Sequence, residues 1–497
     1  MRIENLILND KYEDNILVID HKKKWSKKEI KTRINKMTLL LSNFEKQNNI
    51  GIICENGSEF LVYLFSAFCV NATVVPLDPN LPIDTMMKLL QEIDTKIVLI
   101  SENLKKKLCN ELKNHYVLLN ERDADLFSPE NSLAYGKNTN EDDVAFIFFS
   151  SGTTSGKPKG IQLTHKAIYS NMLAVQDYMQ PNQSDIFFIS KTFVHAPSLV
   201  CEVFVALYVG ALIIAYSDIM APVTMMERIE DTHATVLFVN PTILRLLTEI
   251  GIKRKKCIKV LRLIYTSGST IEKELLEKAQ AIFVNARIYN VYGLTEAGPR
   301  VCAPRIDCST YSLGSVGKSI KGVRIKIINK DGKAADVNEK GIIYVQSQSM
   351  MEGYFKNQSL TKQKLSNGWL ETGDVGYINN SGELFVLGRS DEIINRNSNN
   401  VDPILVENVI KKMEGIRECI VFGIPDKRYI NKIVAAIIVE EGYTYTLKDI
   451  IKFSSSYLLP CEFPQELYIW DTIPLTISGK KSRVLAREKY EKLNNSN

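Results

Sequence analysis

The sequence predicts an α/β protein with a large N-terminal domain and a small α+β lid domain at its C-terminal end. From about residue 50 to 290, short apolar runs alternate with helical stretches, the pattern of two doubly wound sheets covered by helices. After about residue 312, short strands separated by turn signals are typical of a small antiparallel sheet or distorted β-barrel. Beyond Gly388, about a hundred residues suffice for a separate domain.

Each expected element follows from hydrophobic periodicity. In the first part, strands are predicted at 51–55, 73–77, 96–101, 235–239 and 261–265, and helices at 58–70, 84–93, 241–250 and 272–283. In the last part, helices are predicted near 405–413 and 447–458, and strands near 419–422, 434–439 and 467–470. The most apolar run, Val203 to Tyr216, is shorter than the ~20 residues that span a bilayer and contains Gly210, so a buried helix followed by a buried strand is expected.

Composition excludes several classes of protein. Hydrophobic residues make up 45% and charged residues 24% of the 497, as in ordinary globular proteins. A net charge of +5 without a long basic block argues against a nucleic-acid partner. The mixed, acidic N-terminus does not resemble a signal peptide, and the nine cysteines contain no CxxC pair. We expect a cytoplasmic protein with reduced thiols, no zinc site and no membrane span.

The most informative segment is SSGTTSGKPKG, Ser150 to Gly160, which directly follows the apolar run Val144 to Phe149. Glycines free backbone N–H groups to surround an anion, and small hydroxyls and lysines add donors and positive charge. Gly152 and Gly156 enclose three residues and Pro158 follows Lys157, so the Walker pattern is not met. The segment therefore predicts a phosphate-binding loop of another type.

Four further polar motifs follow this loop in order: NVYGLTE (290–296), ETGD (371–374), GRSDE (388–392) and PLTISGKKSR (474–483). Together the five motifs closely resemble the adenylate-forming superfamily of acyl-CoA synthetases, non-ribosomal peptide adenylation domains and firefly luciferase. The resemblance covers nearly the whole chain. It implies ATP-dependent activation of a carboxylic acid to an acyl-adenylate with release of pyrophosphate, and then transfer to a thiol, either CoA or the phosphopantetheine of an acyl or peptidyl carrier protein.

The resemblance also implies roles for individual residues. Those implied to bind the nucleotide phosphates are Ser150, Ser151, Gly152, Thr153, Thr154, Lys159 and Thr295. Tyr292 would stack on adenine with Asn290 at the ring edge, beside Gly293. Asp374 and Arg389 would hold the ribose hydroxyls. Glu296 would bind Mg²⁺, which prefers carboxylate and phosphate oxygens.

Lys480 is implied to bridge the substrate carboxylate and the α-phosphate, and is therefore a predicted catalytic residue with Lys159, Thr295 and Glu296. Asp391 matches the hinge position of the family, about which the C-terminal domain swings between the two half-reactions. The predicted organisation is an adenylation core at 1–388, a hinge at 389–391 and a lid at 392–497 that carries the catalytic lysine.

The residues near His195 bear on the substrate. In acyl- and aryl-CoA synthetases a histidine in this turn often lies against the acyl chain, although a packed core histidine is the alternative interpretation. Amino-acid-activating relatives place an aspartate here as counter-ion of the substrate ammonium, whereas residues 193–196 read FVHA. A fatty, aryl or similar acid is therefore expected. Gly268 resembles the family's turn at the pocket floor, close to the nucleotide.

Two departures from the family pattern affect these expectations. The phosphate loop has one additional residue, Ser155 before Gly156, and Asn397 and Ser398 stand where CoA-using relatives commonly have a Gly-Gly or Ser-Gly pair. The second departure makes adenylation a firmer expectation than transfer to free CoA. The alternatives are a free-standing amino-acid adenylation enzyme of a peptide pathway and, in another class, a catalytically silent nucleotide-binding protein.

Overall fold

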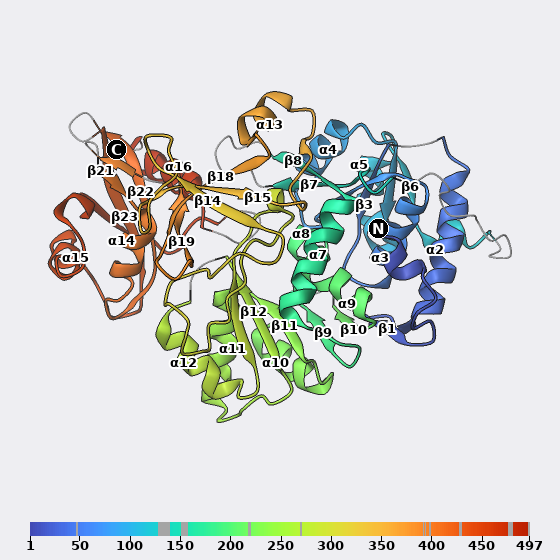
Figure 1. Cartoon of the computed structure of the whole chain (residues 1–497), viewed down its shortest axis with the longest axis horizontal. Helices are drawn as coiled ribbons and strands as arrows, with labels where there is room; N and C mark the ends of the chain where they lie inside the picture. Colours follow the sequence, from blue (N-terminus) through green and yellow to red (C-terminus); the bar gives the residue numbers. More distant parts are fainter. Residues whose placement is uncertain are drawn as a thin grey trace. The chain divides into compact units, whose positions relative to one another are not determined.

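The computed structural model describes residues 1–45, 48–127, 140–150, 158–216, 220–268, 271–390, 392, 394–396, 399–426, 430–475 and 481–495 (Figure 1). The chain divides into two compact units. Unit 1 comprises 1–150, 159–325 and 345–370, and unit 2 is made mainly of 326–344 and 371–497. Over the described residues, no helix combines the length and the apolar character needed to cross a bilayer.

Two seven-stranded sheets form unit 1, as the alternating pattern predicts. In spatial order, the first sheet contains β13 (Arg287–Val291), β12 (Leu263–Ser267), β11 (Val236–Val239), β9 (Ile186–Ile189), β10 (Leu212–Ala215), β1 (Ile16–Ile19) and β2 (Lys24–Ser26). The second contains β16 (Gly353–Tyr354), β8 (Lys159–Thr164), β7 (Val144–Ser150), β4 (Thr73–Leu77), β3 (Asn49–Ile53), β5 (Ile97–Ile100) and β6 (Val117–Leu119). Neighbouring strands are parallel except for the β1–β2, β7–β8 and β8–β16 pairs.

Helices cover both sheets because their apolar residues recur on one face. The helices of unit 1 are α1 (Asn5–Leu8), α2 (Lys27–Ser42), α3 (Ser58–Cys69), α4 (Ile83–Glu92), α5 (Glu102–Leu112), α6 (Glu121–Ala124), α7 (His165–Met179), α8 (Ala196–Ser198), α9 (Phe204–Val209), α10 (Pro222–Asp231), α11 (Pro241–Lys253), α12 (Lys273–Ile282) and α13 (Gln358–Lys364). A π-helical turn, η1 (Leu199–Val203), joins α8 to α9, and a 3₁₀ turn, η2 (Thr295–Ala297), follows β13. The apolar run from Val203 is thus a buried helix followed by buried β10, as predicted.

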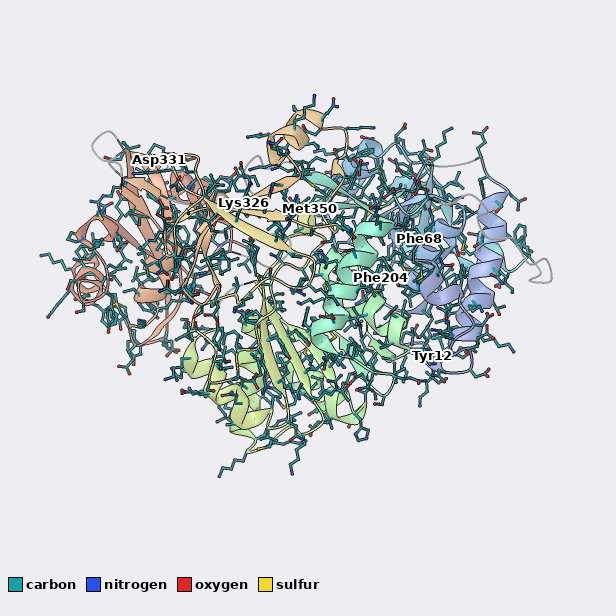
Figure 2. The ribbon with its side chains drawn as sticks, in the orientation of Figure 1. Tyr12, Phe68, Phe204, Lys326, Asp331 and Met350 are labelled. Carbon is teal, nitrogen blue, oxygen red and sulfur yellow. The ribbon has the colours of Figure 1, made fainter. Side chains whose placement is uncertain are left out.

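Helix α7 lies between the two sheets and packs on both (Figure 1). At its first residue, the His165 ring lies 4.8 Å from Phe68 of α3, which in turn packs on Phe146 of β7. At its other end, the Tyr178 ring lies 6.0 Å from Tyr265 of β12. Phe68 and Phe204 of α9 lie in this shared apolar interior (Figure 2). The outer helices α10, α11 and α12 cover the first sheet, and α4 and α5 cover the second.

Where the sequence predicts a small antiparallel sheet or barrel, the structure has a five-stranded sheet whose β17–β18 and β18–β19 pairs are antiparallel. It contains β14 (Arg324–Ile328), β15 (Gly341–Gln346), β18 (Trp369–Ile378) and β17 (Leu365–Ser366), with β19 (Leu384–Arg389) paired to β18. Unit 2 holds the short pair β20 (Ile394–Arg396) and β21 (Asn399–Val401), and a sheet of β22 (Ile416–Asp426), β23 (Ile430–Val439) and β24 (Glu466–Ile469). Its helices are α14 (Pro403–Ile410), α15 (Leu447–Ser454), the 3₁₀ turn η3 (Pro460–Glu462) and α16 (Arg483–Asn495). The predicted α+β content of the C-terminal part is confirmed.

Candidate functional site

The predicted phosphate loop joins β7 to β8, which are antiparallel neighbours with Ser150 opposite Lys159. Ser151, Gly152, Thr153 and Thr154, like Ser155, lie outside the described residues, and so do Lys480 and Asp391. Of Ser150 only the backbone is described. The structure therefore describes only the two ends of the loop. Lys159 lies at the C-terminal end, where β8 begins.

Lys159 lies in a small polar group with two residues distant in sequence. Its Nζ is 6.0 Å from the ring centroid of Tyr354, because β16 pairs with β8 with Tyr354 opposite Ile161. The hydroxyl of Tyr354 donates a hydrogen bond of 3.1 Å to Oε1 of Glu296. The end of the phosphate loop and the predicted Mg²⁺ ligand are thus in one place, and Tyr354 is a linking residue for which the sequence held no signal.

The loop after β13 is folded tightly on itself. A Cβ on Gly293 would lie 1.9 Å from the Pro299 oxygen, and one on Gly298, whose φ is +93°, would lie 2.1 Å from the Ser349 oxygen. Only glycine permits these approaches. The loop therefore holds Thr295 and Glu296 at a fixed position beyond the carboxyl ends of the strands, where parallel α/β sheets commonly bind ligands.

Asn171 of α7 fixes the far end of this loop. Its side chain accepts a bond from the Arg300 N–H and donates to the Arg300 oxygen, both at 3.0 Å, and also donates to Oγ of Ser349 at 3.3 Å. Ser349 in turn donates to the Ala297 oxygen at 2.9 Å. Asn171 is 1% exposed, so these bonds are shielded from water.

Replacing Asn171 with alanine is expected to lower the free energy of unfolding by about 1 to 3 kcal/mol, because it leaves buried backbone groups of Arg300 unsatisfied. Urea unfolding of the full chain measures this. The control is Asn285→Ala, which removes an exposed bond to the Lys259 oxygen and is expected to change stability by less than about 0.5 kcal/mol. Equal effects of the two substitutions would contradict the assignment.

Two other predicted residues lie at the ends of neighbouring strands. Asn290 is the fourth residue of β13 and is 3% exposed; its Oδ1 accepts a 3.2 Å bond from the hydroxyl of Thr266 on β12. Tyr292 exchanges backbone bonds of 3.0 Å with Cys302. Gly268, directly after β12, has φ +109°, a conformation that glycine adopts readily, and a Cβ there would meet nothing within 4 Å.

Unit 2 brings together the predicted ribose pair. Asp374 on β18 is opposite Arg389 on β19, and their side chains form an ion pair of 3.3 Å. Arg389 also donates to the Thr372 oxygen at 2.9 Å. The intervening Gly373 has φ +77°, which suits glycine in the ETGD turn. The two motifs are thus neighbours across one hairpin, as their proposed common task requires.

His195 is exposed at the N-terminal end of α8, so the interpretation as a packed core histidine is wrong. Its backbone is extended before the helix begins. Its role towards the acid stays a prediction. The same segment contains a charged residue that the sequence analysis missed: Glu202 in η1 is 1% exposed, and neither carboxyl oxygen has a hydrogen-bond partner among the described residues.

Glu202 has an unusual electrostatic environment. Burial raises the pKa of its carboxyl to about 8, and the positive charges of Lys191 and Arg300 offset only part of this effect. Arg300 is 3% exposed. Burial lowers the pKa of Arg300, but Cys201 and Tyr178 raise it by more, so its charge persists. Neither Lys191 nor Arg300 was singled out by the sequence: Lys191 lies two residues before FVHA, and Arg300 lies four residues after NVYGLTE.

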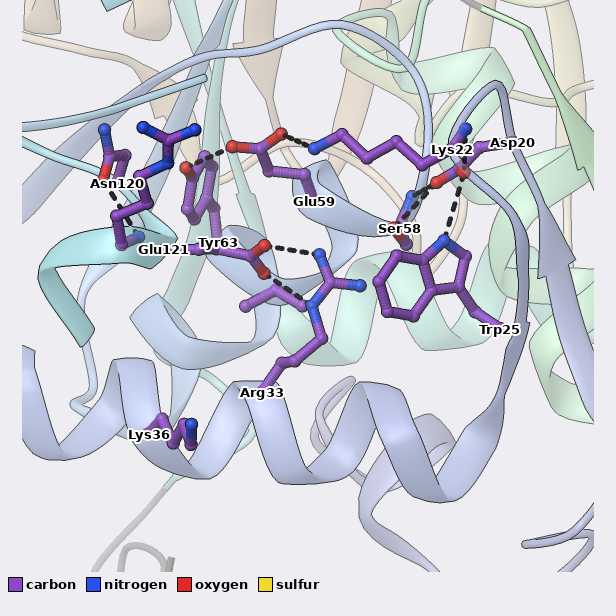
Figure 3. Close-up of polar contacts among 12 residues, drawn as sticks. Asp20, Lys22, Trp25, Arg33, Lys36, Ser58, Glu59, Tyr63, Asn120 and Glu121 are labelled. Atoms are coloured by element: carbon purple, nitrogen blue, oxygen red, sulfur yellow. Dashed lines mark hydrogen bonds and ion pairs between the residues drawn. The ribbon is translucent and has the colours of Figure 1, made fainter. Parts of the chain in front are cut away.

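A second cluster of charged side chains lines a cleft of about 450 Å³ at the edge of the second sheet (Figure 3). Its members are paired with one another. Arg33 of α2 binds Glu121 of α6 through two bonds of 2.8 and 2.6 Å, and Lys22 binds Glu59 of α3 at 2.6 Å. These ion pairs connect α2, α3 and α6. We therefore interpret the cluster as one that stabilises the packing of these helices.

The fold and these motifs define an adenylate-forming protein. Residues 8–355 match the family model of AMP-binding enzymes, and residues 405–480 match the model of the AMP-binding enzyme C-terminal domain. The chain belongs to the AMP-binding enzyme family, within the adenylate-forming superfamily.

Known proteins similar to the chain include CoA ligases. It is 27% identical to oxalate–CoA ligase of Arabidopsis thaliana over 89% of this chain and 88% of that protein. It is also 27% identical to 4-coumarate–CoA ligase 1 of Oryza sativa subsp. japonica, over 89% and 82%. Among solved structures, o-succinylbenzoate coenzyme A synthetase of Bacillus subtilis in complex with ATP and magnesium ion superposes with a TM-score of 0.86 at 22% identity, over 97% of this chain and 99% of that one. The fold expected from the sequence is confirmed.

Proposed function

We propose that this protein is an AMP-forming acid–thiol ligase. A carboxylate oxygen of the acid attacks the α-phosphorus of ATP, the bond to the β-phosphate oxygen breaks, and pyrophosphate leaves. The thiol of the acceptor then attacks the acyl carbon, and AMP is released. The names of the similar CoA ligases support CoA as the acceptor. The thiol of a carrier protein is the second possibility, and the experiments below measure it separately.

The observation that carries this proposal is the grouping of Lys159, Tyr354 and Glu296 beside the β7–β8 connection. Charge develops on phosphate oxygens during the first step, and a fixed cation with hydrogen-bond donors stabilises it. We assign Lys159, Thr295 and the small residues 150–154 to the phosphates. Tyr292, Asn290, Gly293 and Gly268 would border the nucleotide base, and Asp374 and Arg389 would bind the ribose.

Glu296 fits a magnesium ion that enters with ATP. It is one partly exposed carboxylate whose orientation is set by the Tyr354 hydroxyl at 3.1 Å. Mg²⁺ commonly takes one or two carboxylates together with phosphate oxygens. The ion would neutralise charge on the phosphates, and Lys159 would contribute a second positive charge from the end of the phosphate loop.

The primary test is ATP–pyrophosphate exchange with a panel of fatty, aryl, dicarboxylic and amino acids. Exchange that depends on an acid other than an α-amino acid is the expected result. Thioester formation with CoA, and separately with a phosphopantetheinylated carrier protein, identifies the acceptor. ATP binding without exchange for any acid would instead favour the silent nucleotide-binding alternative.

Glu296→Gln is expected to lower the exchange rate about 100-fold at low Mg²⁺, because a neutral amide binds the ion weakly, and a higher Mg²⁺ concentration is expected to restore part of the rate. Glu352→Gln is the matched control, since Glu352 is an exposed carboxylate nearby in the fold, two residues before Tyr354. The measurement is exchange as a function of Mg²⁺ concentration. Identical Mg²⁺ curves for wild type and Glu296→Gln would remove the metal assignment.

A further inference from the structure

Two positive charges near Glu202, those of half-buried Lys191 and buried Arg300, lie beside the strands that form the proposed site. Nζ of Lys191 donates to Oγ of Ser267 at 3.3 Å, and Ser267 is the last residue of β12 before Gly268. Tyr265, two residues earlier, lies on the same face of that strand. The charge of Arg300 acts on Tyr265 as well as on Tyr178 of α7. Lys191 is thus near Ser267, and Arg300 is near Tyr265, on one face of β12.

Arg300 belongs to the same rigid loop as Glu296. The bonds from Asn171 fix its backbone, and the close approach of Gly293 to Pro299 fixes the loop before it. The backbone of Arg300 is therefore fixed four residues along the chain from Glu296, and its side chain is buried. A charged side chain that is buried in this way does not serve to keep the surface soluble, and is better suited to binding an anionic ligand.

The charge of Arg300 is not neutralised by the described part of the chain. Its immediate partners, Cys201 and Tyr178, are neutral at pH 7 because burial raises the pKa of both. Within the described residues, its Nε has no hydrogen-bond partner and no carboxylate forms a salt bridge with it. A buried, unpaired cation is costly, so a counter-ion is expected when the protein is at work.

Glu202 does not supply that counter-ion. An ionised Glu202 bonded to Arg300 would have at least one satisfied oxygen, yet both of its oxygens lack partners among the described residues. Its raised pKa, about 8, keeps the carboxyl protonated at neutral pH. A protonated carboxyl donates one hydrogen bond and does not neutralise the charge of Arg300. The π-helical turn that carries it is a feature often found at functional sites.

We propose that Arg300 and Lys191 bind a second anionic group on the acid substrate, and that the carboxyl of Glu202 donates a hydrogen bond to the same group. This inference rests on the proposed function and names its substrate class: a dicarboxylic acid, or an acid whose tail carries another anionic group. The first carboxylate reacts with ATP, and the second is held by Arg300 and Lys191. Arg300 is then a determinant of specificity in direct contact with substrate.

The test compares acids matched in size. Exchange is measured with succinate against butyrate, glutarate against valerate, and phthalate against benzoate. In the wild type we expect kcat/KM to favour the diacid at least about 10-fold in one or more pairs, as charge-assisted hydrogen bonds allow. In Arg300→Met, which keeps most of the length of the side chain, the ratio is expected to fall to about one through a rise in KM for the diacid. Arg245→Met, at an exposed arginine of α11, should keep the wild-type ratio.

Several results would overturn the inference and leave the proposed function intact. Exchange that the wild type supports only with monoacids would do so, as would a diacid preference that survives in Arg300→Met. If Arg300→Met does not fold, Arg300→Gln and the wild-type ratios alone decide the question. Glu202→Gln retains a donor and is expected to keep the diacid preference. A wild-type preference for 4-aminobutyrate that Glu202→Gln abolishes would instead make Glu202 a carboxylate partner of an ammonium group. Failure of exchange with every acid would refute the proposed function itself.

Discussion

Replacing Lys480 with alanine is expected to slow ATP–pyrophosphate exchange by about 100- to 1,000-fold while ATP still binds. The reason is that the amine of Lys480, which we propose reaches both the attacking carboxylate and the α-phosphate, would no longer stabilise the charge that develops there. Exchange kinetics measure the rate, and titration calorimetry measures ATP binding. Undiminished exchange in Lys480→Ala would contradict the proposed role.

The adjacent lysine provides a matched control. Lys481 binds Glu407 at 3.2 Å and Glu418 at 3.0 Å and donates to the Cys419 oxygen at 2.7 Å. Burial lowers its pKa, but Glu407 and Glu418 raise it by more, so it stays charged. Lys481→Ala is therefore expected to lower stability by about 1 to 3 kcal/mol, whereas Lys480→Ala should leave the unfolding transition unchanged. Comparing the two alanine variants would thus distinguish a loss of catalysis from a loss of stability.

Much of the fold was predictable because it depends on local pattern. The runs that became β3, β4, β5, β11 and β12 are almost continuously apolar, as buried parallel strands require. The helices that follow β4, β5, β11 and β12 have one apolar face, whereas α3, which follows β3, is buried on nearly all sides. The pairing of Asp374 with Arg389 across a hairpin could also be predicted, because the residues between ETGD and GRSDE have the pattern of two strands joined by a turn. The domain boundary at 388 and the hinge at Asp391 stay predictions.

The group formed by Lys191, Glu202 and Arg300 was not predictable in this way. Its members come from a strand-end turn, a π-helical turn and a glycine-rich loop, and only tertiary packing brings them together. A partial signal did exist: Glu202 is a single acid within the apolar run from Leu199 to Val209. Helical periodicity does not reveal whether such an acid faces water, and the π-turn shifts the residues that face inward.

The structure also shows how the chain that follows Lys480 is anchored. Arg483, 7% exposed, binds Glu407 of α14 at 2.5 Å and Glu392 at 2.8 Å, and donates to the Val421 oxygen of β22 at 3.0 Å. Glu392 immediately follows the predicted hinge residue Asp391. A single buried side chain therefore connects the chain after Lys480 to the residue next to the hinge within unit 2.

Arg483→Met is accordingly expected to destabilise unit 2 by about 3 to 5 kcal/mol, because it leaves Glu407, 3% exposed, with a partly uncompensated buried charge. Hydrogen exchange on the full chain should show faster exchange in β22, β23 and α14 with β12 and β13 unchanged, and ATP–pyrophosphate exchange should fall although Lys480 is intact. The double variant Arg483→Met with Glu407→Leu is expected to recover most of the stability, since replacing both members of a buried pair is often neutral. Recovered stability without recovered activity would mean that Arg483 positions Lys480 as well as stabilising the unit. Unchanged protection of β22 in the single variant would show that the network carries neither role.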